Sequence, residues 1–135
     1  MKLILPWPPS ANTYWRHIAM RGRPRTLLSK AGREYRSRVQ ERVLQQAPGH
    51  PMIMGPVHVS IDAWLPDQRR RDADNLLKAT LDALQSAGIY GDDSQISRLL
   101  VSKAYDAARA GELHVSIAEA PKAVDYRQAL GDDPA

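Results

Sequence analysis

The chain has 135 residues with ordinary shares of hydrophobic and charged side chains, enough for one domain with a core and too few for two. It contains no cysteine, so disulfides, thiolate-bound zinc and a cysteine nucleophile are excluded. The net charge of +4 is uneven: residues 1–71 contain 13 Lys and Arg against 4 Asp and Glu, and the rest contains 6 against 11. This asymmetry favours a phosphate-binding surface beside a site that gathers carboxylates, although arginines can also merely solvate helix faces.

The N-terminal part begins with a predicted strand and continues as a long irregular segment. Leu3–Leu5 is an apolar run that a proline cluster ends, too short for a signal peptide or a membrane span. A cytoplasmic protein is the simplest interpretation of a chain without cysteine. From Pro6 to Leu28 the sequence has no helical or strand period, but it is rich in arginine and aromatic residues. A segment of this kind is more often functional than idle, so we expect a functional loop.

Two main helices and three more strands are predicted in the remainder. The first helix runs from its N-cap, Ser29, to about Gln46, and the second runs from about Ala73 to Ala87 and is closed by Gly88. The buried stripes are Tyr35, Val39 and Val43 in the first helix and Leu77, Leu81 and Leu84 in the second; the strands are 57–64, 97–105 and 113–117. The order β-α-β-α-β-β predicts one small α/β domain with a mixed sheet at 1–120, followed by a mobile tail at 121–135.

Two carboxylates, Asp72 and Asp74, lie where a predicted strand gives way to a predicted helix. They can converge on one point if Asp72 is still in extended backbone. Without cysteine, an all-oxygen site suited to Mg²⁺ or Mn²⁺ is the natural metal site. The alternative is that both residues only stabilise the helix N-terminus.

Neighbouring residues bear on this choice. Lys78 lies one helical turn after Asp74, either as a surface ion pair or as a group that neutralises a phosphate. Asp92 and Asp93 follow the second helix, where a short return can bring a third carboxylate back to the sheet edge, unless the pair forms only a turn or cap. Three arginines directly precede Asp72. Carboxylates flanked by arginines and a lysine are typical of metal-assisted phosphodiester chemistry.

The histidines give less indication of function than the carboxylates. His58 and His114 lie in predicted strands and His50 lies in a loop between prolines, so we interpret all three as structural. His17 lies in the aromatic and basic N-terminal segment, where it could contact a phosphate. No histidine pair has the spacing of a zinc hydrolase, and no glycine-rich phosphate loop is present.

Taken together, these motifs resemble the RusA family of Holliday junction resolvases, in order and spacing, over about residues 3–119. The similar segments are Leu5-Pro6-Trp7-Pro8-Pro9-Ser10-Ala11-Asn12; Tyr14, Arg16 and His17; Ser29 and Tyr35-Arg36; Asp72-Ala73-Asp74-Asn75-Leu76-Leu77-Lys78 with Leu81-Asp82-Ala83-Leu84; and Gly91-Asp92-Asp93-Ser94-Gln95-Ile96. The stretch 47–55 is longer than the family pattern leads us to expect, and the segment after Pro121 has no counterpart.

The resemblance implies a homodimeric endonuclease that binds four-way DNA junctions and nicks symmetric strands with Mg²⁺ or Mn²⁺, in DNA recombination and repair. It implies that Asp72, Asp74 and Asp93 are the essential metal-binding carboxylates, that Asp92 is the lesser member of its pair, and that Lys78 is the basic catalytic partner. The predicted DNA-binding residues are Arg69, Arg70, Arg71, Arg16, His17 and Arg36.

Two other functions compete with this one. A DNA-binding module without catalysis would use the aspartates only as caps. A metal-dependent nucleotide phosphohydrolase would use the same carboxylates on a small substrate, but a single nucleotide needs few of the arginines.

Overall fold

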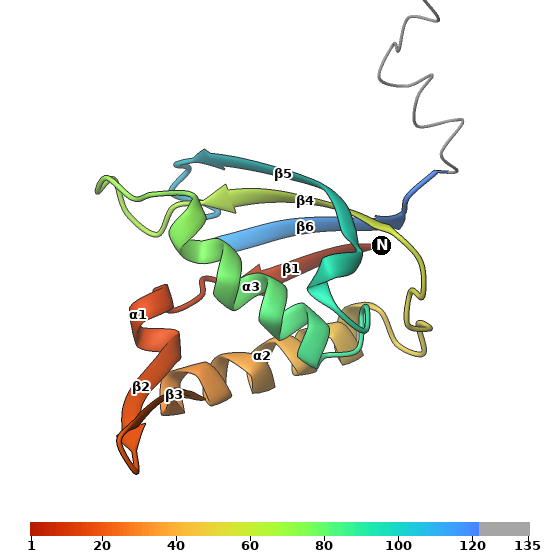
Figure 1. Cartoon of the computed structure of the whole chain (residues 1–135). Helices are drawn as coiled ribbons and strands as arrows, with labels where there is room; N and C mark the ends of the chain where they lie inside the picture. Colours follow the sequence, from red (N-terminus) through yellow and green to blue (C-terminus); the bar gives the residue numbers. More distant parts are fainter. Residues whose placement is uncertain (122–135) are drawn as a thin grey trace, which may run out of the picture.

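The structure, a computed structural model, describes residues 1–121 and has a four-stranded sheet with helices on one of its faces (Figure 1). The sheet strands are β1 (Lys2–Pro6), β4 (Val57–Trp64), β5 (Ile96–Ala104) and β6 (Glu112–Glu119). The helices are α1 (Ala11–Tyr14), α2 (Lys30–Gln46) and α3 (Asp74–Ser86), and a short 3-10 helix, η1 (Asp93–Gln95), precedes β5. The predicted α/β class with two main helices is confirmed.

The sheet is mixed, as predicted, with the strand order β1-β6-β4-β5. Strand β6 runs antiparallel to both β1 and β4, whereas β5 runs parallel to β4. Two parallel neighbours need a crossover connection, and α3 supplies it. As a result, α3 starts near the end of β4 and returns towards the beginning of β5 (Figure 1).

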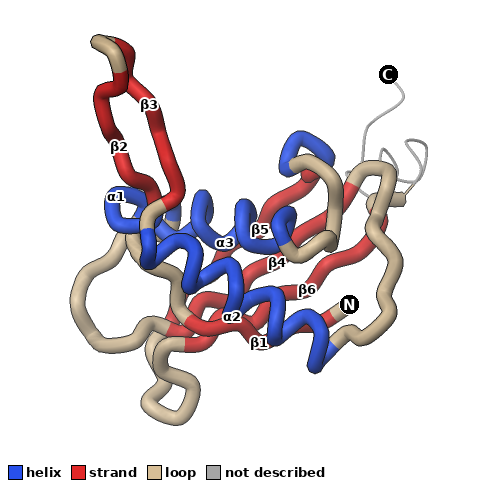
Figure 2. Tube along the Cα trace, turned by 90° about the horizontal axis from the view of Figure 1, so that it is seen from below, coloured by secondary structure: helices blue, strands red, loops and turns tan. Residues whose placement is uncertain are grey.

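The core lies between the sheet and the helices α2 and α3, which cover the same face (Figure 2). In β4 every second side chain is buried, which matches the alternation in the sequence. The predicted stripe of α2 is buried as well. In α3 the buried residues are Leu76, Ala79, Thr80, Ala83 and Leu84. The predicted Leu77 and Leu81 are only partly buried and pack at the margin of the core.

The prediction of an irregular loop at 6–28 is wrong. Helix α1 is followed by a hairpin of β2 (Trp15–Met20) and β3 (Arg23–Leu28), which projects from the domain as an arm (Figures 1 and 2). Arg21 and Gly22 form its two-residue turn with φ angles of 52° and 76°, as a type I′ turn requires. Most of the arm is exposed, so its sequence lacks the apolar alternation that would have revealed the strands.

The predicted helix ends agree with the structure. The Ser29 side chain accepts a hydrogen bond from the Gly32 N–H at 3.0 Å and so caps α2. Gly88, just beyond α3, has the positive φ angle of 82° that favours glycine. The predicted tail lies outside the described residues, apart from Pro121. Within residues 1–121, no helix has the length and apolar character needed to cross a membrane.

Candidate active site

Asp72 and Asp74 lie at the start of α3 with exposed side chains. The N-cap position belongs to Ala73, which has helical backbone angles, and no side chain caps the helix. Among residues 1–121, neither carboxylate accepts a hydrogen bond or joins an ion pair; Asp72 is tied to the helix only through its carbonyl, which accepts from the Asn75 N–H at 3.3 Å. The two carboxylates are therefore not side-chain caps, and their oxygens are free for a ligand.

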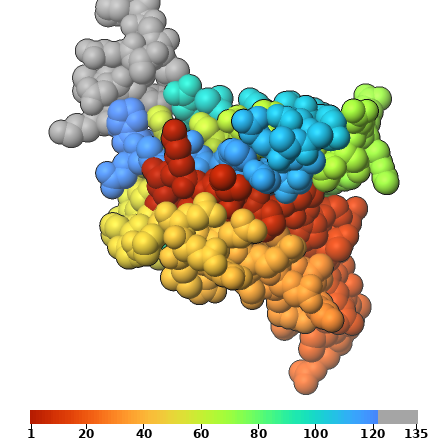
Figure 3. Space-filling model, turned by 180° about the vertical axis from the view of Figure 1, so that it is seen from behind, coloured from red at the N-terminus to blue at the C-terminus, as the bar shows by residue number. Residues whose placement is uncertain are grey.

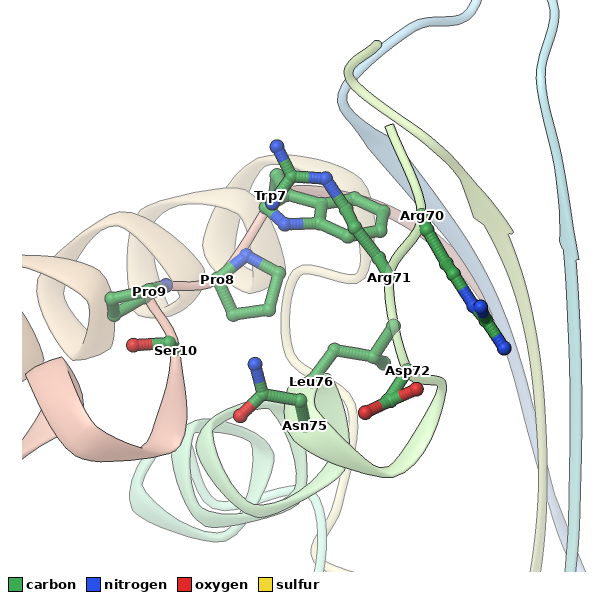
Figure 4. A pocket seen from close by; sticks show the side chains of 9 residues that line it. All are labelled: Trp7, Pro8, Pro9, Ser10, Arg70, Arg71, Asp72, Asn75 and Leu76. Atoms are coloured by element: carbon green, nitrogen blue, oxygen red, sulfur yellow. The ribbon is translucent and has the colours of Figure 1, made fainter. Parts of the chain in front are cut away.

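A pocket of about 330 Å³ opens beside Asp72 (Figure 4). It is lined by Trp7, Pro8, Pro9 and Ser10 from the segment after β1 and by Arg70, Arg71, Asp72, Asn75 and Leu76 at the start of α3. An aromatic and proline wall thus faces two arginines and a carboxylate. This mixture suits a ligand that has both an apolar ring and an anionic group. Trp7 and Asn75 were not among the predicted site residues, although both stand in the family-like motifs.

Arg71 links the loop before α3 to the rest of the domain. Its Nη2 donates to Asp67 Oδ2 at 3.0 Å, and its guanidinium lies over the Trp7 ring, 6.0 Å from the centroid (Figure 4). Its carbonyl accepts from Lys103 Nζ at 2.6 Å, which connects the loop to the end of β5. Hydrogen bonds from Arg71 and from the Arg69 backbone N–H hold the pKa of Asp67 below its usual range. Arg71 is therefore partly engaged within the fold, whereas the side chain of Arg69 is 83% exposed.

Asn75 and Lys78 extend the site along α3. The Asn75 Oδ1 accepts from the Ala11 N–H at 3.3 Å and so joins the start of α3 to α1. Lys78 is exposed one turn beyond Asp74. The ion pairs of residues 1–121 do not include one between Lys78 and Asp74, so the surface pair considered from the sequence is not formed. The ammonium group remains free to contact an anion.

Asp92 and Asp93 lie at the other end of α3. Asp92 is the N-cap of η1: its Oδ1 accepts from the Ser94 N–H at 2.8 Å, and Gln95 Oε1 accepts from the Asp92 N–H at 3.0 Å. The hydrogen bond from Ser94 lowers the pKa of Asp92. The Asp93 N–H donates to Gln85 Oε1 in the last turn of α3 at 3.0 Å. Asp92 therefore has the capping role considered from the sequence, and it lies beside Asp93.

Helix α3 keeps the two pairs of carboxylates apart. Its 13 residues rise about 18 Å from first to last, whereas Mg²⁺ binds oxygen at about 2 Å. Within residues 1–121, no three Asp, Glu or His side chains are grouped so that they could hold a metal ion. The expected return of Asp93 to the edge that carries Asp72 is therefore not formed within one chain.

A charged network joins the base of the arm to both long helices. Arg36 of α2 donates from Nε and Nη2 to the two carboxylate oxygens of Asp82 in α3, at 2.8 and 3.0 Å. Tyr14 at the end of α1 donates its hydroxyl to Asp82 and accepts from Arg36 Nε at 3.2 Å. Burial, and then the hydrogen bond to Asp82, raises the pKa of Tyr14. Arg36 thus has a structural role that sequence reasoning missed, and DNA contact by its remaining exposed surface stays a prediction.

The other predicted DNA-binding residues, Arg16 and His17, lie on β2 of the arm with exposed side chains. The Oγ1 atom of Thr26, on the facing strand, lies 3.3 Å from His17 Nδ1. The arm also carries Arg21, Arg23 and Arg25, so its charge is entirely positive. The arm is therefore a basic surface separate from the carboxylates.

The three histidines interpreted as structural lie neither in α3 nor in the loop before it. His58 is in β4 and His114 is in β6, where its Nε2 lies 2.8 Å from Glu112 Oε2. His50 lies between α2 and β4. None of them is among the residues that line the pocket beside Asp72.

Comparison with known proteins gives one consistent family. The family model described as endodeoxyribonuclease RusA matches residues 6–118. The crossover junction endodeoxyribonucleases RusA of Escherichia coli (strain K12) and Shigella sonnei (strain Ss046) are 41% identical to this chain over 117 residues, which is 87% of this chain and 92% of each relative. The protein of the same name from Enterobacteria phage 82 is 40% identical to this chain over 117 residues, again 87% of this chain and 92% of the relative.

Proposed function

The chain belongs to the RusA family of endodeoxyribonucleases, and we propose that it is an endonuclease that resolves four-way DNA junctions by nicking symmetric strands. The observation that carries the proposal is the pair of free, exposed carboxylates at the start of α3, beside a pocket with two arginines. Oxygen ligands next to cationic groups suit phosphodiester hydrolysis, because the substrate is anionic and the nuclease needs hard donors for its cation. Recombination and repair of DNA in the bacterial cytoplasm are the processes in which such a substrate arises.

The proposed cofactor is Mg²⁺ or Mn²⁺, and the proposed ligands are Asp72, Asp74 and Asp93 with Asp92 in a lesser role. The chemistry of this donor set fits such a cation, because both ions prefer carboxylate oxygen. Its placement in a single chain does not fit, since α3 separates the first two aspartates from the last two. One chain by itself therefore offers only part of a site.

Lys78 and the arginines have roles toward the phosphate. Lys78 projects from the same face of α3 as Asp74, one turn further on, and is proposed to offset negative charge that develops on the reacting phosphate. Arg69 and Arg70 are proposed to hold the DNA backbone beside Asp72. Arg71 positions the loop through Asp67 and Trp7, and it contributes charge to the same surface.

The arm is proposed to grip one DNA segment of the junction. It stands away from the domain, and Figure 3 shows it protruding at one corner of the molecule. An isolated two-stranded hairpin is only marginally stable, so the arm depends on its anchor. That anchor is Tyr14, whose carbonyl accepts from the Ser29 N–H at 3.0 Å and whose ring packs edge-on against Trp15 and Tyr35. Phosphate contacts by the arm would add affinity without sequence selectivity.

The test compares a synthetic four-way junction with a linear duplex of matched sequence, with and without Mg²⁺. We expect symmetric nicks in the junction only when Mg²⁺ is present. Asp74→Asn should abolish the nicks, whereas Asp62→Asn, on the face of the sheet without helices, should leave them unchanged. Retention of the junction without cleavage under Mg²⁺ or Mn²⁺ would instead identify a DNA-binding module. Hydrolysis of free nucleotides without junction cleavage would identify a phosphohydrolase.

A further inference from the structure

The pocket at the start of α3 has one rigid apolar wall. Trp7, Pro8 and Pro9, which form it, follow directly after β1. The carbonyl of Pro6, the last residue of β1, accepts from the Tyr35 hydroxyl at 2.9 Å, so the end of the strand is held against α2. Proline fixes the φ angle of the backbone, and three of the four residues 6–9 are prolines. The partly exposed ring of Trp7 therefore stands on a preformed wall, which suits a flat ring of a ligand.

The opposite side of the pocket carries a free hydrogen-bond donor. The Oδ1 atom of Asn75 accepts from the Ala11 N–H, and this bond fixes which way the amide is turned. The Nδ2 atom of Asn75 donates no hydrogen bond within residues 1–121. Figure 4 shows this nitrogen directed towards Pro8 on the apolar wall. Asn75 thus offers one donor to the edge of a group that lies between it and the wall.

Two arginines line the pocket beside Asp72. Arg70 forms no ion pair within residues 1–121. Arg71 holds Asp67 through Nη2, yet 35% of its side chain is exposed. Guanidinium groups bind phosphate strongly, and Asp72 is a proposed ligand of the cation. The pocket therefore joins a surface for a ring, a donor for the edge of that ring, and positive charge for a phosphate.

We propose that this pocket binds one nucleobase that has left the base stack at the branch point of the junction, from a nucleotide next to the phosphate that is cut. Trp7 and Pro8 stack against the base, Asn75 donates to its edge, and Arg70 contacts the phosphate. The inference rests on the proposed function and deepens it, because it names the part of the substrate that the pocket recognises.

A base pocket favours branched DNA over a continuous duplex. A base within a duplex is paired and stacked on both sides, so its extrusion costs free energy, and this cost is least where pairing is already disturbed. The pairs at a branch point have lost a continuous stacking neighbour, so a base leaves the stack there at the lowest cost. Stacking tolerates every base, because each has a flat face. The Asn75 donor adds a preference for bases that present an acceptor at their edge.

Combined changes in the protein and the DNA test the pocket. Junctions with an abasic residue at either of the two nucleotides that flank the cut are compared with the intact junction, in binding assays without a divalent cation. Trp7→Ala should weaken binding of the intact junction about five- to 140-fold, the typical loss of one stack between a base and an aromatic ring. On the junction that lacks the bound base, wild type and Trp7→Ala should bind equally, because no base remains to stack. Equal losses on the intact junction and on both abasic junctions would overturn the proposal.

Controls separate base stacking from a loss of structure. Trp64→Ala removes an indole from the face of the sheet without helices, and it should bind every junction as the wild type does. Trp7→Phe keeps an aromatic ring and should retain most of the affinity for the intact junction. Arg71 lies over the Trp7 ring, so a loss that acts through Arg71 would also appear on the abasic junctions. On a linear duplex Trp7→Ala should leave binding unchanged, since the bases there stay stacked; a loss as large as on the junction would contradict the base pocket.

Asn75→Asp tests the contact with the edge of the base. This substitution keeps an oxygen that can accept from the Ala11 N–H, but it replaces the Nδ2 donor by an acceptor. Affinity is measured for junctions with each of the four bases at the bound position, relative to the abasic junction, which cancels the effect of the added negative charge. The wild type should prefer bases that present an acceptor, and the variant should lose this preference. An unchanged order of the four bases would overturn the assignment of Asn75.

The failures of the two proposals can be told apart. If the wild-type protein cuts no junction with Mg²⁺ or Mn²⁺, the proposed function fails, while the binding assays still report a base in the pocket. If the wild-type protein cuts junctions and Trp7→Ala loses as much affinity for the abasic junctions as for the intact one, the base pocket fails and the function stands.

Discussion

Replacement of Arg23 and Arg25 by glutamine tests whether the arm contacts DNA phosphates. Both side chains are exposed on β3, and neither forms an ion pair within residues 1–121, so their charges are available to a ligand. Each phosphate that a protein neutralises adds about 0.9 to the slope of log affinity against log salt on duplex DNA. Loss of two contacts should therefore lower the slope by about 1.8, which weakens binding roughly sixty-fold at 0.1 M salt if the two proteins bind equally at 1 M salt.

The assay is equilibrium binding of a labelled four-way junction over a series of salt concentrations. The matched control replaces Lys2 and Arg98 by glutamine, because both are exposed on the face of the sheet that carries no helix and neither forms an ion pair within residues 1–121. This control removes the same charge and should leave the slope unchanged. An arm variant whose slope equals that of the wild type would show that the arm does not touch phosphate. Equal losses in both variants would show that only the net charge matters.

Four further outcomes are expected. Asp72→Asn and Asp74→Asn should each reduce junction cleavage at least a hundredfold while junction binding persists, because the amide keeps the shape of the side chain but loses its charge. Gel assays of junction binding and of junction cleavage check this. Lys78→Ala should slow cleavage on the order of a hundredfold, the typical cost of one lost charge-stabilising group, in single-turnover kinetics with normal junction binding. Gly32→Ala should lower the free energy of unfolding by about 1–3 kcal/mol, the typical cost of overpacking, as measured by urea titration. The reason is that a Cβ at this position would lie 2.5 Å from the backbone carbonyl oxygen of Tyr14. The free energy of unfolding should fall as the pH rises above 10.0, the ordinary tyrosine pKa, because burial raises the pKa of Tyr14 in the folded state and the unfolded chain ionises first. Urea titrations at increasing pH, with Tyr14→Phe for comparison, measure how the free energy of unfolding changes with pH.

Sequence patterns located most elements because burial leaves a period in the sequence. The alternation of Val57, Val59 and Ile61 and the four-residue repeat of Tyr35, Val39 and Val43 each follow from one buried face, and the structure confirms both. The arm left no such trace, because its strands bury almost nothing. Only the turn at residues 21–22 could have indicated it, since glycine is frequent in two-residue hairpin turns.

The sequence by itself identified the charged side chains and those with oxygen atoms that can bind a cation, because residue types and their spacing along the chain are read directly from it. Asp72 and Asp74 stand two residues apart, and their exposure at the start of a helix follows from the local pattern. The tertiary structure alone decided which distant groups meet. It paired Arg36 with Asp82, and it placed Asp93 at the opposite end of α3 from Asp72. The physical reason is that local spacing fixes only neighbours along the chain, whereas the length of α3 and the direction of β5 fix the distance between the two acidic segments.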